Sequence, residues 1–64
     1  MLNINGEEKN AAGMTVAQYL TESGYQAARV VVEINGTIVP KSQYGSATFA
    51  DGDTVEIVSF VGGG

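Results

Sequence analysis

Only one stretch of this chain is patterned as an α-helix, and that stretch is short. Thr15 is a favourable N-cap residue, and Gln18 three positions later completes a T-x-x-Q capping box. Gly24 suits the left-handed conformation just past a helix end, so we expect a helix over about Val16–Ser23. Val16 and Leu20 are four residues apart, so they share one face of this helix. Because no other helix is available, this one must cover one face of a sheet.

The rest of the chain is patterned as short strands joined by tight turns. Asn-Gly dipeptides at 5–6 and 35–36 favour two-residue hairpin turns, and the second turn pairs Ile34 with Thr37. Pro40 ends the second strand of that hairpin because proline lacks a backbone N–H to donate. The predicted strands are Met1–Asn5, more weakly Glu7–Ala12, Val30–Ile34, Thr37–Val39, Thr48–Ala50 and Thr54–Phe60.

This order of elements predicts an α+β fold. When the first element of a sheet is a hairpin and the final element of the chain is a strand, that final strand can run beside the first strand in the centre of the sheet. We therefore expect a β-grasp roll, with a mixed sheet of four to five strands covered by one short helix. Residues 1–61 form the expected domain, and residues 62–64 form a flexible glycine tail that buries nothing by itself.

The composition narrows the chemistry that the chain can perform. Its 64 residues include no cysteine and no histidine, which removes thiol nucleophiles, disulfides and thiolate metal sites, as well as the commonest general base. The phosphate-cradling loop G-x-x-x-x-G-K-[ST] is also missing. We expect a protein that is not an enzyme, binds no metal, and binds no cofactor of its own.

Charge and hydropathy restrict the classes of partner that this chain is expected to bind. Three basic residues against seven acidic ones give a formal net charge of −4. This balance disfavours nucleic acid, and it favours protein partners with basic patches. No apolar run approaches the roughly 20 residues that span a bilayer, and the first residues do not follow the pattern of a secretory signal. We expect no membrane association and a cytoplasmic location.

Four segments in order resemble the bacterial sulfur-carrier family of thiamin (thiazole) biosynthesis, whose members are ubiquitin-like. The segments are AAGMTVAQYL at the helix entry, VEINGTIVPKSQY through the hairpin, ADGDTVEIVSFV at the last strand, and the final Gly63-Gly64. The resemblance implies a protein substrate. An ATP-dependent adenylyltransferase, similar to ubiquitin-activating enzymes, adenylates Gly64. Sulfur from a persulfide donor then replaces AMP to leave a thiocarboxylate, and thiazole synthase takes the sulfur.

The resemblance and the residue pattern together give the candidate site. Three glycine residues span at most about 10 Å, and without Cβ atoms they suit a narrow channel in a partner. Gly62 departs from the family, in which an alanine is usual at this position. Val55 and Ile57 are expected in the core. The candidate site residues are Gly64 as the sulfur-carrying residue, Gly62 and Gly63 in the partner's channel, and Val58, Phe60 and Val61 as a docking patch on the face opposite the core.

Three alternatives stay open from the sequence. The small subunit of molybdopterin synthase has the same fold and the same terminal thiocarboxylate, but it is usually longer than this chain. A ubiquitin-like covalent modifier joins its last glycine to a lysine as an isopeptide. A plain interaction module has an inert tail. Independently of these alternatives, the sheet face that carries Val58 and Phe60 is either a docking patch or a face that is simply buried or has apolar residues scattered on the surface.

Overall fold

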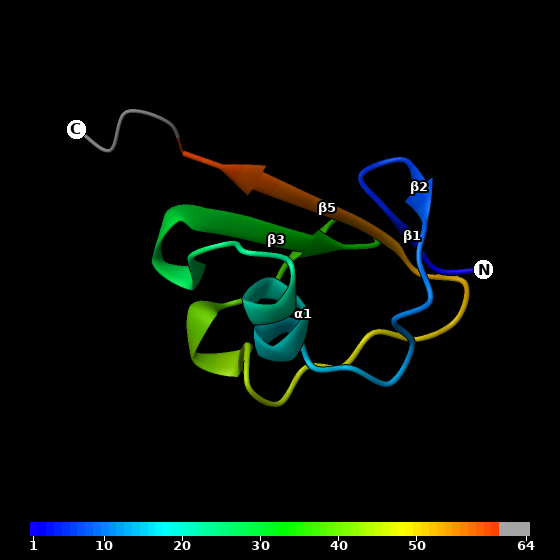
Figure 1. Cartoon of the computed structure of the whole chain (residues 1–64), viewed down its shortest axis with the longest axis horizontal. Coiled ribbons are helices and arrows are strands. Elements are labelled where there is room, and N and C mark those ends of the chain that lie inside the picture. Colours follow the sequence, from blue (N-terminus) through cyan, green and yellow to red (C-terminus); the bar gives the residue numbers. More distant parts are fainter. Residues whose placement is uncertain (61–64) are drawn as a thin grey trace.

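A computed structural model describes residues 1–60 of the chain. Five strands form one sheet in the order β2-β1-β5-β3-β4, in which β5 runs parallel to β1 and antiparallel to β3. Figure 1 shows α1 on one side of this sheet. The elements are β1 (Asn3–Ile4), β2 (Glu7–Glu8), α1 (Val16–Glu22), the 3₁₀ turn η1 (Ala27–Arg29), β3 (Val30–Ile34), β4 (Thr37–Ile38), the 3₁₀ turn η2 (Lys41–Gln43) and β5 (Thr54–Ser59).

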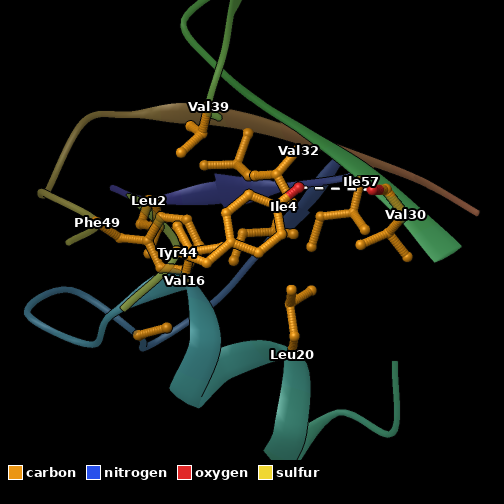
Figure 2. Close-up of a cluster of buried hydrophobic side chains, with 12 residues drawn as sticks. Leu2, Ile4, Val16, Leu20, Val30, Val32, Val39, Tyr44, Phe49 and Ile57 are labelled. Carbon is orange, nitrogen blue, oxygen red and sulfur yellow. Dashed lines mark hydrogen bonds between the residues drawn. The ribbon is translucent and has the colours of Figure 1, made fainter. Parts of the chain in front are cut away.

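The core fills the space between α1 and the sheet. Val16 and Leu20 point from the helix toward the strands, as Figure 2 shows. The Tyr44 hydroxyl donates a long hydrogen bond of 3.5 Å to the Val30 carbonyl, so this aromatic side chain is buried with its polar group partnered. The buried residues are Leu2, Ile4, Ala11, Val16, Leu20, Val30, Val32, Val39, Tyr44, Phe49, Val55 and Ile57.

Both ends of α1 form as the sequence predicts. The Thr15 hydroxyl accepts from the Gln18 backbone N–H, and the Gln18 side chain accepts from the Thr15 N–H, which completes the capping box. At the other end Ser23 is the C-cap. Gly24 follows with φ of +83°, and the N–H groups of Gly24 and Tyr25 donate to the carbonyls of Thr21 and Leu20. This pair of bonds is the Schellman motif, which closes the helix by local interactions alone.

The prediction of a strand at Thr48–Ala50 is wrong. Thr48 makes a single bridge to Thr15, and the Phe49 backbone exchanges hydrogen bonds with Met14 and Gly13 instead of joining the sheet. The segment pairs with the helix entry because the Phe49 side chain is only 2% exposed and lies in the core. There it meets the Tyr19 ring edge-on, with the ring centroids 5.6 Å apart.

Several strands are shorter than their sequence pattern indicates. β2 ends at Glu8, because the chain then turns to bring Ala11 into the core, and a Met14 N–H···O=C Ala11 bond closes that turn. Past Glu8, the Lys9 N–H still donates to the Leu2 carbonyl at 3.0 Å, and the predicted pairing of residues 10–12 is absent from the described sheet. The second hairpin has the predicted register, with Ile34 opposite Thr37.

Candidate functional site

The expected site lies at the end of β5, which is the central strand. Val55 and Ile57 point into the core as predicted. Beyond the strand, the Phe60 N–H donates to the Arg29 carbonyl at 2.8 Å, so the pairing with β3 extends to the last described residue. The predicted residues Val61, Gly62, Gly63 and Gly64 lie outside the described residues. The structure therefore defines the strand that leads to the predicted sulfur-carrying residue.

The Asn5 side chain extends β1 along β5. β1 pairs only with the first two residues of β5, Thr54 and Val55. Past that point, the Asn5 carboxamide accepts from the Ile57 N–H at 2.8 Å and donates to the Ile57 carbonyl at 3.3 Å. A single side chain thus satisfies the backbone groups that a longer β1 would pair with. The sequence pattern placed Asn5 at the end of the first strand and in the turn that follows. It did not indicate the contact with Ile57, because no local pattern reveals a partner 52 positions away.

A second asparagine holds the start of β5 from the other side. The Asn35 Oδ1 accepts from the Thr54 N–H at 2.9 Å, and its Nδ2 donates to Asp53 Oδ1 at 3.0 Å. Asn5 and Asn35 both occupy the left-handed region, with φ of 53° and 52°. Both turns therefore use asparagine in two ways, since it tolerates positive φ and binds the central strand through its side chain.

Replacing Asn5 separates these two contributions. We expect Asn5→Gly to lower the free energy of unfolding by about 1–2 kcal/mol, through loss of the two bonds to Ile57. Asn5→Ala should lower it by about 1–2 kcal/mol more, because alanine has a Cβ that disfavours positive φ. Urea denaturation followed by circular dichroism measures both values. If both variants match the unmodified protein, the carboxamide does not hold β5.

The sheet face opposite α1 carries exposed apolar side chains. Val58 is 48% exposed and Phe60 is 55% exposed, and both follow the outward alternation of β5. Val58 is directly opposite Val31 of β3, and Ile38 of β4 is 62% exposed on the same face. We call this surface the open face and define it by Val31, Glu33, Ile38, Glu56, Val58 and Phe60. The predicted docking role of Val58 and Phe60 stays a prediction.

The ion pairs of the described chain lie away from the open face. Lys9 Nζ is 3.0 Å from Glu7 Oε1, and this hydrogen bond and the charge of Glu7 raise the pKa of Lys9. The Met1 amino group is 3.4 Å from Asp51. Among residues 1–60, no three His, Cys, Asp or Glu side chains group closely enough to hold a metal ion. Over the same residues, no helix is long and apolar enough to cross a membrane.

These observations define the class of protein. A five-stranded mixed sheet with β1 and β5 parallel at its centre and one helix across one face is the β-grasp fold of ubiquitin-like proteins. The chain belongs to the ThiS family, whose sequence model matches residues 2–64. Its resemblance to thiamin-biosynthesis sulfur carriers is thereby confirmed.

Individual relatives agree with the family. Thiazole synthase of Paramagnetospirillum magneticum is 53% identical over 64 residues, which cover 98% of this chain. The chain spans only 20% of that relative's length. Sulfur carrier protein ThiS of Bacillus subtilis is 37% identical over 67 residues, covering both chains completely. The crystal structure of the thiamine biosynthesis protein ThiS from Geobacter metallireducens superposes with a TM-score of 0.76 at 34% identity, covering 98% of this chain and 97% of that one.

Proposed function

We propose that this chain is a sulfur carrier in thiamin biosynthesis and that Gly64 holds the sulfur as a thiocarboxylate. The observation that supports the proposal most is membership of the ThiS family over residues 2–64. The relative from Bacillus subtilis that matches over its whole length is named a sulfur carrier. Two further relatives are named thiazole synthase, which supports thiazole synthase as the proposed acceptor of the sulfur.

The proposed chemistry begins with a carboxylate, which is a poor electrophile because it is anionic and lacks a leaving group. An oxygen of the Gly64 carboxylate attacks the α-phosphorus of ATP, and pyrophosphate leaves. The terminal sulfur of a persulfide then attacks the acyl carbon, and AMP leaves. A thiol cleaves the resulting S–S bond and frees the thiocarboxylate, whose sulfur is a better nucleophile than the original oxygen.

The catalytic groups for these steps are supplied by partners in this proposal. The chain contains no histidine and no cysteine, so it lacks the side chains that most often act as base or persulfide carrier. An ATP-dependent adenylyltransferase supplies the nucleotide site, and a separate persulfide protein supplies the sulfur. The chain itself contributes the reactive carboxylate, the strand that leads to it and a surface for docking.

The open face is the proposed docking surface for the adenylyltransferase. Two of its apolar residues, Val58 near the end of β5 and Phe60 just after it, lie directly before the segment that holds the reactive group. Exposed apolar side chains that are grouped in this way mark interaction sites. A partner that contacts them holds β5 in a fixed orientation, so that the following residues enter the nucleotide site.

Polar substitutions on this face test the docking role. We expect Val58→Ser with Phe60→Ser to raise the KM for adenylation about tenfold or more, since buried aromatic and aliphatic anchors dominate interface energies. The unfolding midpoint should change little, because both side chains are exposed. Ala12→Ser, at an exposed position outside the open face, is the control. An unchanged KM in the double variant would mean that the partner docks elsewhere.

Adenylation itself tests the proposed function. The purified chain is incubated with the adenylyltransferase of the same organism, ATP and labelled pyrophosphate. We expect label to enter ATP only when the chain is present, because the first step is reversible. Absence of exchange contradicts the proposal. Formation of higher-mass conjugates through lysine would instead identify a covalent modifier.

A further inference from the structure

Two carboxylates face each other across β3 and β5. Glu33 and Glu56 are directly opposite in the strand register, and both belong to the open face. Like charges in directly opposite positions on one face of a sheet destabilise the pair of strands. Glu56 is exposed and Glu33 is half-buried, so solvent screens Glu33 incompletely. This arrangement is unfavourable for the isolated fold.

No basic side chain in the part of the chain that the structure describes offsets these two charges. The sequence has three basic residues, and none of them forms an ion pair with Glu33 or Glu56 within residues 1–60. Lys9 pairs with Glu7, and Lys41 Nζ donates to the backbone carbonyls of Ala27 and Ala28 at 3.1 and 2.8 Å. Arg29 forms no ion pair within residues 1–60. A positive charge that neutralises this pair of carboxylates therefore has to come from outside residues 1–60.

Apolar side chains border the carboxylate pair on two sides. Ile38 is directly opposite Glu33 on its other edge, and the Val31–Val58 pair forms the next outward row along the sheet. Arginine suits such a surface, because its stem packs on apolar groups while its planar guanidinium donates to two carboxylates at once. Lysine offers a single point charge and cannot present the same fork.

We propose that the Glu33–Glu56 pair receives an arginine of the adenylating partner. The partner docks on the open face, and its own apolar residues surround that arginine. This proposal rests on the proposed function, since it specifies the chemistry of the same partner. The net charge of −4 complements a basic partner surface and assists the encounter at low salt. Once the guanidinium lies between the two carboxylates, the repulsion across the strands becomes attraction to the partner.

The proposal predicts opposite effects on stability and binding. The double variant Glu33→Gln with Glu56→Gln removes the repulsion, so its unfolding midpoint should equal or exceed that of the unmodified protein. Its Kd for the adenylyltransferase, measured by titration calorimetry, should rise about tenfold or more at low salt. The Kd should also become less dependent on salt concentration. A residue with a merely structural role would weaken stability and binding together.

A matched double variant removes the same charge elsewhere. Glu7→Gln with Glu22→Gln neutralises two exposed carboxylates away from the open face, because Glu7 is opposite the inward-facing Ile4 in the strand register and Glu22 belongs to α1. We expect its Kd to change less than about threefold, through the general loss of steering. Equal Kd changes in the two double variants would overturn the specific site, as would an unchanged Kd for Glu33→Gln with Glu56→Gln. If the unmodified chain is not adenylated at all, the proposed function fails first, so the two failures are distinguishable.

Discussion

Deleting Gly64 is expected to abolish sulfur loading, with less than about 1% of the unmodified rate remaining, because a carboxylate displaced by one residue no longer reaches the reacting phosphate. The fold should persist, since the described pairing of β5 with β3 ends at Phe60. Pyrophosphate exchange and the intact mass after incubation with ATP and a persulfide donor measure the loss. The unfolding midpoint provides the matching structural readout.

A Gly64→Ala variant is the control for this deletion. It keeps a carboxylate at the same position and adds one methyl group, so we expect slower loading than in the unmodified protein but faster loading than in the deletion variant. If the deletion variant loads at the original rate, another carboxylate is the acceptor and the assignment of Gly64 is wrong. If the alanine variant is as inactive as the deletion, the channel of the partner excludes any Cβ at this position.

Replacing Phe49 with alanine is expected to unfold the domain. Truncating a buried phenylalanine costs about 3–5 kcal/mol, whereas a domain of this length has a total stability of roughly 3–10 kcal/mol. Phe49 is 2% exposed and also makes the edge-on contact with Tyr19. Far-UV circular dichroism and urea titration at 25 °C should show a largely unfolded or severely destabilised population.

The conservative replacement separates volume from shape at this site. Phe49→Leu retains most of the buried volume and is expected to cost about 1–2 kcal/mol, which leaves the domain folded. The backbone bonds from Phe49 to Met14 and Gly13 do not depend on the side chain. A Phe49→Ala variant with nearly unchanged stability would contradict the assignment of this side chain to the core.

The helix could be predicted from sequence because its ends are set locally. Thr15 and Gln18 bond to each other within three residues, and Gly24 supplies the positive φ that closes the last turn. The second hairpin was predictable for the same reason, since a two-residue turn fixes the pairing of Ile34 with Thr37. The parallel pairing of the first and last strands at the centre of the sheet could be predicted from the order of the elements. The similarity of the fold to the Geobacter metallireducens structure agrees with this topology.

Interactions between distant segments could not be predicted in this way. The Asn-Gly pattern at Asn5 fully accounts for a turn, so it gave no indication that the carboxamide also binds Ile57. Likewise, a β-like pattern at Thr48–Ala50 did not reveal that Phe49 enters the core and draws its backbone away from the sheet. Strand lengths depend on such tertiary contacts more than on local propensity.

The candidate site was predictable only in part. Alternation along β5 indicated that Val58 and Phe60 point away from the core, and both side chains are exposed. The pairing of Glu33 with Glu56 required the register between β3 and β5. That register was not available from sequence, because the chain between those strands includes β4, a 3₁₀ turn and the Phe49 segment. The roles of Val61, Gly62, Gly63 and Gly64 stay predictions.

The most direct test of the central claim is the mass of the protein taken from its own cells. The chain is isolated under thiamin limitation, its intact mass is recorded, and its last peptide is fragmented. We expect a chain that ends at Gly64 and a mass increase equal to replacing one oxygen by sulfur, with the sulfur located on Gly64. A chain that continues past Gly64, or one that ends there and never acquires sulfur under these conditions, would contradict the account.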